Sequence, residues 1–220
     1  MRRQGIVCLI IALSLCGAGC AIRPAQLHWQ LERADSVGGH AAQVLGAPAA
    51  REEGGRKALC FNGSSDGLIL PVNPIEGWPR FTIEILFQPE RDGPEEQRFL
   101  HIQDEAQRRA LIETRLITPE TWSLDTFLYA TATDRLTLLD RSIVQPTDRW
   151  YWAALSYDGA LMTHYVNGVK QLEGKVSLPP MSAGRISLGV RQNQVHWFKG
   201  CIAEVRFTAA ALPPERLQKP

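Results

Sequence analysis

Apolar and polar residues alternate in short segments along most of this chain, with the two-residue period of a β-strand. The clearest segment is residues 81–87, in which Phe or Ile occupies every second position. Thr82 and Glu84 fall between them, so one face of the segment is apolar and the other is partly polar. The pattern predicts a strand that turns its apolar face toward a protein core.

Comparable segments follow one another after Lys57, bounded by turn residues such as Gly, Pro, Asn and Asp. Many short strands with turn signals between them are typical of a sandwich or jelly roll. The expected strands are residues 58–61, 67–71, 81–87, 99–102, 110–116, 123–130, 136–140, 150–157, 161–166, 185–190 and 201–207.

The connections between these segments support the same fold. Asn167-Gly168 separates two strand-like segments and is a strong hairpin signal, because a type I′ turn needs positive φ at both positions. Residues 27–31 predict a first strand, residues 47–55 a loop, and residues 213–217 one helical turn. We therefore predict an all-β protein, a two-sheet antiparallel β-sandwich, with one domain over residues 22–220.

The N-terminus has the pattern of an export signal. Two arginines follow the initiating methionine, residues 6–15 are apolar, and small residues precede Cys20. This layout is typical of a secretory signal, and the apolar run is too short for a stable membrane span. We interpret residues 1–21 as the signal segment. Lipid modification of Cys20 would give a periplasmic or outer-membrane lipoprotein, whereas cleavage after Ala21 would release a soluble or secreted protein.

Composition narrows the classes of partner. Lys and Arg number 24 against 23 Asp and Glu, a formal charge of +1, so nothing indicates nucleic-acid binding, and we expect membrane association only through an N-terminal lipid. The five histidines and five cysteines show no metal-ligand spacing, so we expect no metal or cofactor. Outside the signal segment, only Cys60 and Cys201 remain.

Four stretches of the chain combine strand and turn motifs: residues 58–71, residues 81–89, residues 149–159 with 165–168, and residues 185–189 with 198–207. Together they resemble the laminin-G-like branch of the concanavalin A-like lectin/glucanase superfamily, and their order along the chain is that of the family. The resemblance implies a jelly roll in which the opening and closing strands are neighbours. That placement would allow a Cys60–Cys201 disulfide, although the alternative is two buried thiols that never meet. The stretches are ALCFNGSSDGLILP (58–71), FTIEILFQP (81–89), RWYWAALSYDG (149–159) with YVNG (165–168), and RISLG (185–189) with FKGCIAEVRF (198–207).

Departures from the family pattern bear on activity. Asn167 and Ala203 stand where the family usually has Asp, and we find no carboxylate-dense loop that would supply the oxygen ligands of the Ca²⁺ some members bind. Glycosidases of the superfamily carry paired carboxylates on one strand, whereas Glu84 stands alone in its segment. Retaining hydrolysis needs two carboxyl groups about 5 Å apart. The sequence therefore favours a non-catalytic module.

A group of polar strand residues is the first candidate ligand site. Glu113 and Arg115 are two positions apart and share a strand face, and we expect Glu84, Asp125 and His164 to join them on a concave surface. A catalytic interpretation would make Glu113 or Glu84 the acid/base and Arg115 a charge clamp. The alternative is that these residues form cross-strand pairs on a solvated face.

The loop at residues 189–199 is the second candidate. It carries Arg191, Asn193, His196 and Trp197, and binding groups concentrate on loops held by a rigid scaffold. The structural alternative is that Trp197 packs beneath the loop.

Three functions stay open. The first is an exported module that binds carbohydrate, such as a cell-surface glycan, through the concave face or the rim loops. The second is a glycan-acting hydrolase or lyase with a groove around Glu84, Glu113 and Arg115. The third is a protein-interaction or scaffold domain. The sequence does not indicate an oligomeric state.

Overall fold

The computed structural model describes residues 24–53 and 55–220. The expected signal segment, including Cys20, lies outside the described residues. Strands make up nearly all the regular structure, and the only helical element in the described part is the 3-10 turn η1 (Pro214–Arg216). No helix in that part has the length and apolar character needed to cross a membrane. The predicted all-β fold class is confirmed.

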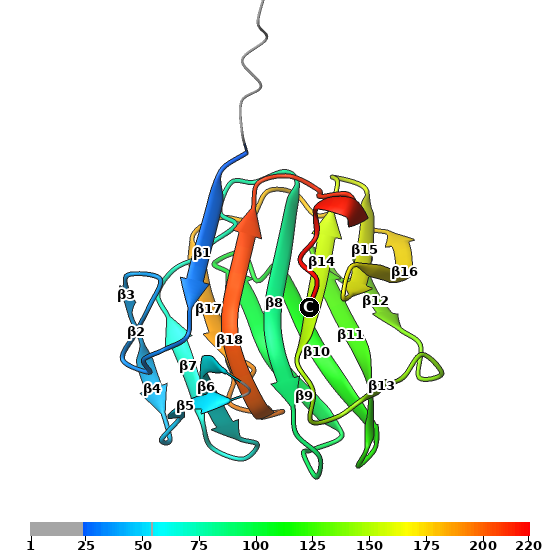
Figure 1. Cartoon of the computed structure of the whole chain (residues 1–220). Coiled ribbons are helices and arrows are strands. Elements are labelled where there is room, and N and C mark those ends of the chain that lie inside the picture. Colours follow the sequence, from blue (N-terminus) through cyan, green and yellow to red (C-terminus); the bar gives the residue numbers. More distant parts are fainter. Residues whose placement is uncertain (1–23, 54) are drawn as a thin grey trace, which may run out of the picture.

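The first sheet lies in front in Figure 1 and is antiparallel throughout. Strand β18 occupies its centre: β8 pairs along one edge, and β6 and then β1 pair along the other. In order across the sheet, the strands are β16 (Val169–Lys175), β15 (Leu161–Val166), β14 (Tyr151–Tyr157), β8 (Phe81–Pro89), β18 (Lys199–Thr208), β6 (Arg56–Asn62) and β5 (Ala49–Glu53), with β1 (Gln26–Gln30) beside β18.

A two-stranded ribbon, separate from both large sheets, is formed by β2 (Ser36–Val37) and β3 (His40–Ala41).

The second large sheet packs behind the first, also with antiparallel pairing. The second sheet has the order β12 (Arg135–Leu139), β11 (Thr121–Tyr129), β10 (Arg109–Thr118), β9 (Glu96–Asp104), β17 (Gly184–Leu188), β7 (Gly67–Leu70) and β4 (Gln43–Leu45), with β13 (Gln145–Pro146) beside β11.

The core fills the space between the two sheets, and the two-residue alternation explains its composition. Phe81, Ile83, Ile85 and Phe87 of β8 point inward. Phe87 contacts residues of the second sheet. Its ring stacks on Phe99 with centroids 4.4 Å apart and lies edge-on to Trp122 at 5.2 Å. Burying an aromatic side chain of this size stabilises a fold by about 1.5–3 kcal/mol. These contacts across the sandwich fix which face of each strand is left for the outside.

Most expected strands are present, with ends within a few residues of the predicted ones. The predicted hairpin joins β15 to β16, and both of its turn residues have positive φ, 52° at Asn167 and 76° at Gly168. The expected first strand corresponds to β1, and the expected helical turn to η1.

Two strand boundaries differ from expectation. Residues 47–55 were predicted to be a loop, but Ala49–Glu53 form the edge strand β5, which pairs with β6. An edge strand tolerates charged side chains and needs no apolar face, so its sequence carries little signal. Strand β9 begins at Glu96, three residues before the expected start at Phe99, because polar residues precede the apolar run.

Cys60 and Cys201 form a disulfide bond. The two residues are direct partners in the register of β6 and β18. They lie on the outer face of the first sheet in a small apolar cluster with Leu86 and Trp152. The bond therefore ties an early strand of the domain to its last strand.

Candidate functional site

Three of the candidate residues meet on the outer face of the second sheet. Glu113 and Arg115 lie on β10, and Asp125 lies on β11 directly opposite Glu113 in the register. Ile112 and Leu124, their neighbours along the strands, point into the core. The two-residue period of a strand therefore turns Glu113, Arg115 and Asp125 outward.

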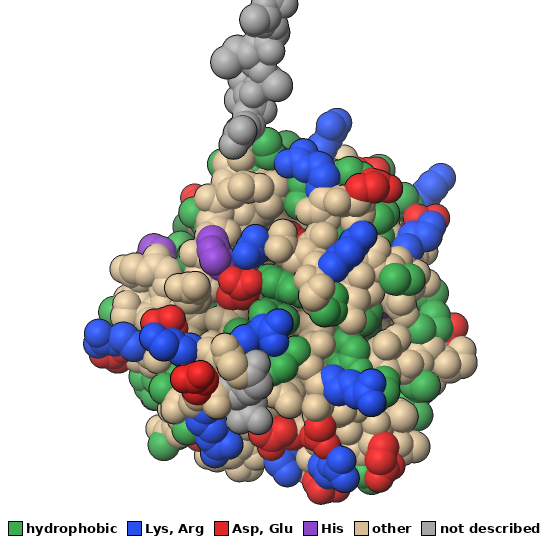
Figure 2. Space-filling view, viewed as in Figure 1, with side chains coloured by type: hydrophobic (Ala, Val, Ile, Leu, Met, Phe, Trp, Pro, Cys, Tyr) green, Lys and Arg blue, Asp and Glu red, His purple; other side chains and the backbone are tan. Residues whose placement is uncertain are grey.

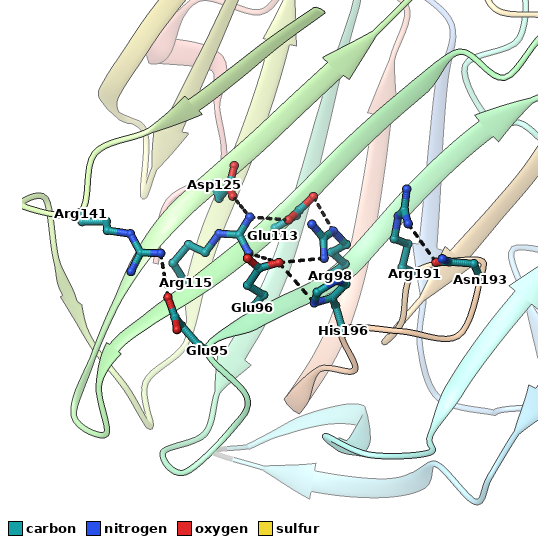
Figure 3. A network of polar contacts seen from close by, with 10 residues as sticks. All are labelled: Glu95, Glu96, Arg98, Glu113, Arg115, Asp125, Arg141, Arg191, Asn193 and His196. Atoms are coloured by element: carbon teal, nitrogen blue, oxygen red, sulfur yellow. Dashed lines mark hydrogen bonds and ion pairs between the residues drawn. The ribbon is translucent and has the colours of Figure 1, made fainter. Parts of the chain in front are cut away.

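Arg115 joins three carboxylates from three strands. Its Nη2 lies 2.6 Å from Oδ2 of Asp125 and 3.3 Å from Oε2 of Glu113, while Nη1 lies 2.9 Å from Oε2 of Glu96. Arg98 on β9 completes the group, with Nε 3.1 Å from Oε1 of Glu113 and Nη1 3.2 Å from Oε2 of Glu96. Figure 3 shows these side chains converging across neighbouring strands. The result is a continuous network of ion pairs.

The network forms one end of a small pocket with a volume of about 140 Å³. At the other end, the guanidinium of Arg109 lies 4.4 Å from the ring centroid of Tyr129. The half-buried ring of Phe127 adds apolar surface between the two ends. The pocket therefore combines charged hydrogen-bonding groups with an aromatic face. It is lined by Arg98, Arg109, Leu111, Glu113, Arg115, Asp125, Phe127, Thr137 and Arg191.

The two carboxylates in the pocket are almost completely buried, with 2% exposure for Glu113 and 1% for Asp125. Burial raises the pKa of Glu113 to about 7, and the nearby Asp125 adds to the rise, while Arg98 and Arg115 oppose it. Burial also raises the pKa of Asp125 against the opposing effect of Arg115. Oδ1 of Asp125 accepts no hydrogen bond from the described residues. This oxygen has almost no exposed surface, so it lies beneath the wall of the pocket.

The loop between β17 and β18 borders this pocket. Arg191 lines it and donates from Nη1 to Oδ1 of Asn193 at 3.2 Å. Nδ1 of His196 lies 3.3 Å from Oε2 of Glu96, which connects the loop to the ion-pair network. Trp197 is half-buried and packs toward the start of β7. The two candidate groups, strand face and loop, therefore meet at one site through Arg191 and His196.

Glu84 and His164 lie elsewhere, so the expectation of one shared groove is wrong. Glu84 is on the outer face of the first sheet, on the far side of the sandwich, where its Oε1 accepts a hydrogen bond from the backbone N–H of Gln218 at 2.7 Å. Burial raises its pKa. His164 points into the sandwich, and its Nδ1 lies 2.9 Å from Oγ1 of Thr126. Its pKa is lowered to about 4 by burial.

The physical reason is that the two outer faces of a sandwich point in opposite directions. Glu84 and Glu113 each face outward from a different sheet, so similar strand patterns cannot bring them together. In β15, the side chain of His164 points into the sandwich and the side chain of Tyr165 points outward.

Sequence reasoning missed several residues of the pocket. Glu96 and Arg98 precede the apolar run at Phe99, so they were assigned to no strand. Their spacing of two carries the same signal as Glu113 and Arg115, and extending the alternation backwards would have found them. Arg109 was missed because it is the first residue of β10.

No group of three or more His, Cys, Asp and Glu side chains is placed to hold a metal ion within residues 24–53 and 55–220. The pocket carboxylates are instead engaged by guanidinium groups.

A family model described as the concanavalin A-like lectin/glucanases superfamily matches residues 62–218, and the chain belongs to this superfamily. The match spans the strands that build the pocket. Among curated protein sequences, none matches the chain significantly.

Solved structures share the fold at low sequence identity. Domain 4 of AbnA, a GH43 extracellular arabinanase from Geobacillus stearothermophilus solved with arabinotriose, is 21% identical with a TM-score of 0.66, covering 88% of this chain and 97% of that domain. The binding domain of Paraclostridial Mosquitocidal Protein 1 is 13% identical with a TM-score of 0.66, and that of botulinum neurotoxin serotype D is 14% identical at 0.61. These two matches cover 86% of this chain but only 50% and 49% of the longer binding domains.

Proposed function

We propose that this protein is an exported, non-catalytic carbohydrate-binding module, and that its ligand occupies the pocket on the outer face of β9, β10 and β11. The observation that carries the proposal is the pocket's combination of buried charged groups with the ring of Phe127. Proteins hold sugars by hydrogen bonds to hydroxyls and by packing of apolar ring faces on aromatic side chains. Both kinds of group are within one pocket here.

Two further points support the proposal. The AbnA domain, which matches over nearly its whole length, was solved with arabinotriose. The guanidinium groups also hold the pocket side chains in place before a ligand arrives, and such preorganisation reduces the entropy lost on binding.

A second candidate function is glycan hydrolysis, because Glu113 has a pKa near 7 and lies opposite Asp125 in the register. A protonated acid beside an ionised carboxylate is the pairing that glycosidases use. Against it, both carboxylates are held by Arg98 and Arg115. Release of reducing sugar by the wild type, abolished in Glu113→Gln, would establish hydrolysis and overturn the non-catalytic proposal.

The binding proposal is tested on a glycan array, followed by calorimetry with each oligosaccharide that binds. Phe127→Ala removes the aromatic face and is expected to weaken binding about tenfold, within the range for loss of one stacking contact. Val169→Ala, at a 62% exposed position on β16, is the matched control and should bind as the wild type does. Absence of any array signal, or equal affinity of Phe127→Ala, would contradict the proposal.

The export part of the proposal depends on the N-terminal pattern. We expect the protein in the periplasm or at the outer membrane, anchored through a lipid on Cys20. Wild-type protein should partition into the detergent phase and Cys20→Ser into the aqueous phase. Wild-type protein that is aqueous after processing would identify cleavage after Ala21, and unprocessed protein in the cytoplasm would exclude export.

A further inference from the structure

The four arginines of the pocket fall into two pairs with different surroundings. Arg98 and Arg115 belong to the ion-pair network and are neutralised by carboxylates. Arg109 instead lies over the ring of Tyr129 and donates weakly from Nε to a backbone carbonyl at 3.4 Å. Arg191 donates to the neutral amide of Asn193.

Neither Arg109 nor Arg191 forms an ion pair with a carboxylate of the described residues. The pKa values of Arg191 and of the nearby His101 indicate positive electrostatic potential at this end of the pocket. Burial lowers the pKa of Arg191, and Arg98 and Arg109 lower it further by repulsion. Burial also lowers the pKa of His101 to about 3, with Arg191, Arg109 and Arg98 all contributing. The pocket is thus neutralised at one end and positive at the other.

The positive end is also held in position. Stacking on Tyr129 restricts the guanidinium of Arg109, and the hydrogen bond to Asn193 restricts that of Arg191. Planar guanidinium groups recognise carboxylate and sulfate oxygens through paired N–H donors. Repulsion between unpaired guanidinium groups is relieved when an anion lies between them.

We propose that the pocket selects sugars bearing an anionic substituent, a carboxylate or a sulfate, bound by Arg109 and Arg191. The neutralised end then receives the sugar hydroxyls beside the ring of Phe127. At about 140 Å³ the pocket is smaller than the roughly 300 Å³ of ordinary ligand sites, so it holds about one sugar unit. This inference rests on the proposed function and adds the class of ligand to it.

The test is calorimetry with matched probes: trigalacturonic acid, its neutral methyl ester, and a heparin-derived sulfated tetrasaccharide. The methyl ester keeps the rings and removes the charge, so we expect it to bind at least about tenfold more weakly than the acid. Binding by the sulfated probe alone would identify sulfate as the anion, and binding by the acid alone would identify carboxylate. Affinity for the anionic probe should fall as salt rises, because part of the attraction is electrostatic.

Substitutions of single arginines test which residues bind the anionic group. Arg109→Gln and Arg191→Gln should each weaken binding of the anionic probe about tenfold, and should weaken binding of a neutral array ligand by a smaller factor. Arg141→Gln is the matched control, because Arg141 pairs with Glu95 on the same face outside the pocket. Thermal melting checks that each variant is folded.

The outcomes separate the two proposals. Suppose that neutral array ligands bind in a way that depends on Phe127, and that adding an anionic group does not raise their affinity. This result would overturn the anion preference and leave the binding function standing. Anionic probes that bind equally well to Arg109→Gln and Arg191→Gln would also overturn it. If no glycan of any charge binds, both proposals fail.

Discussion

The two outer faces of the sandwich contain the same kinds of residue but differ in what covers them. On the first sheet, the C-terminal segment lies across the strands, and Leu212 and Leu217 pack on Tyr165. Glu84 accepts a hydrogen bond from the backbone N–H of Gln218, and both residues line a pocket beside the segment. Figure 2 shows this face, with apolar surface between charged side chains that stand singly or in small groups. Two pockets open beside the C-terminal segment, one lined by Glu84 and Arg206 and the other by Tyr165 and Lys170.

On the second sheet, the corresponding charged residues border an open pocket. Glu113 is as deeply buried as Glu84, but its neighbours are the guanidinium groups of Arg98 and Arg115. Burial raises the pKa of both carboxyl groups. A raised pKa therefore does not by itself identify a binding site. The partners of the carboxyl group distinguish the two faces: Glu113 pairs with Arg98 and Arg115, whereas Glu84 accepts from the backbone of Gln218.

Removing the guanidinium group of Arg115, which links three carboxylates, should give the largest difference in unfolding free energy between the two faces. Arg115→Met leaves Asp125 buried without its ion-pair partner and leaves Glu113 paired with Arg98 alone, and we expect unfolding free energy to fall by about 3–5 kcal/mol. Arg206→Met is the counterpart on the first sheet, where Arg206 is one-third exposed and pairs with Glu204. It should cost at most about 1 kcal/mol. Equal losses in urea unfolding would show that the network is no more than a surface feature.

The second-largest expected effect is the change in unfolding free energy with pH. The pKa of Glu113 rises from 4.5 to about 7 on folding, so the folded state binds more protons between these values and stability falls as pH rises through them. Glu113→Gln removes this dependence, and wild-type unfolding free energy should drop relative to the variant by up to about 3 kcal/mol between pH 5 and pH 8. Glu84→Gln should act in the same direction with smaller amplitude. Parallel pH curves for wild type and Glu113→Gln would contradict the raised pKa.

The smallest expected effect tests whether the faces are independent. Leu217→Ala opens a cavity beneath the C-terminal segment on the first sheet, and we expect a loss of about 2 kcal/mol in unfolding free energy. Ligand affinity should not change, because the pocket lies on the other side of the core. A change in affinity beyond about twofold would show that the two faces are coupled.

The sequence was sufficient for the fold because the alternation of Phe81, Ile83, Ile85 and Phe87 determines which face of β8 enters the core. The same rule placed Glu113 and Arg115 on one outer face. It could not determine which sheet each strand joins, so Glu84 was grouped with residues on the far side of the molecule. Sheet assignment depends on pairing between distant segments, and one strand's alternation carries no information about its partners.

The pocket residues are widely separated along the chain, from Arg98 on β9 to Arg191 after β17. A segment ending before Arg191 contains most of the ion-pair network but lacks one of the two unpaired guanidinium groups. Contacts at such long sequence separation form late, after slower chain closure. A chain whose C-terminal part has not yet been synthesised therefore has no complete pocket, because Arg191 and the last strand β18 are missing from it.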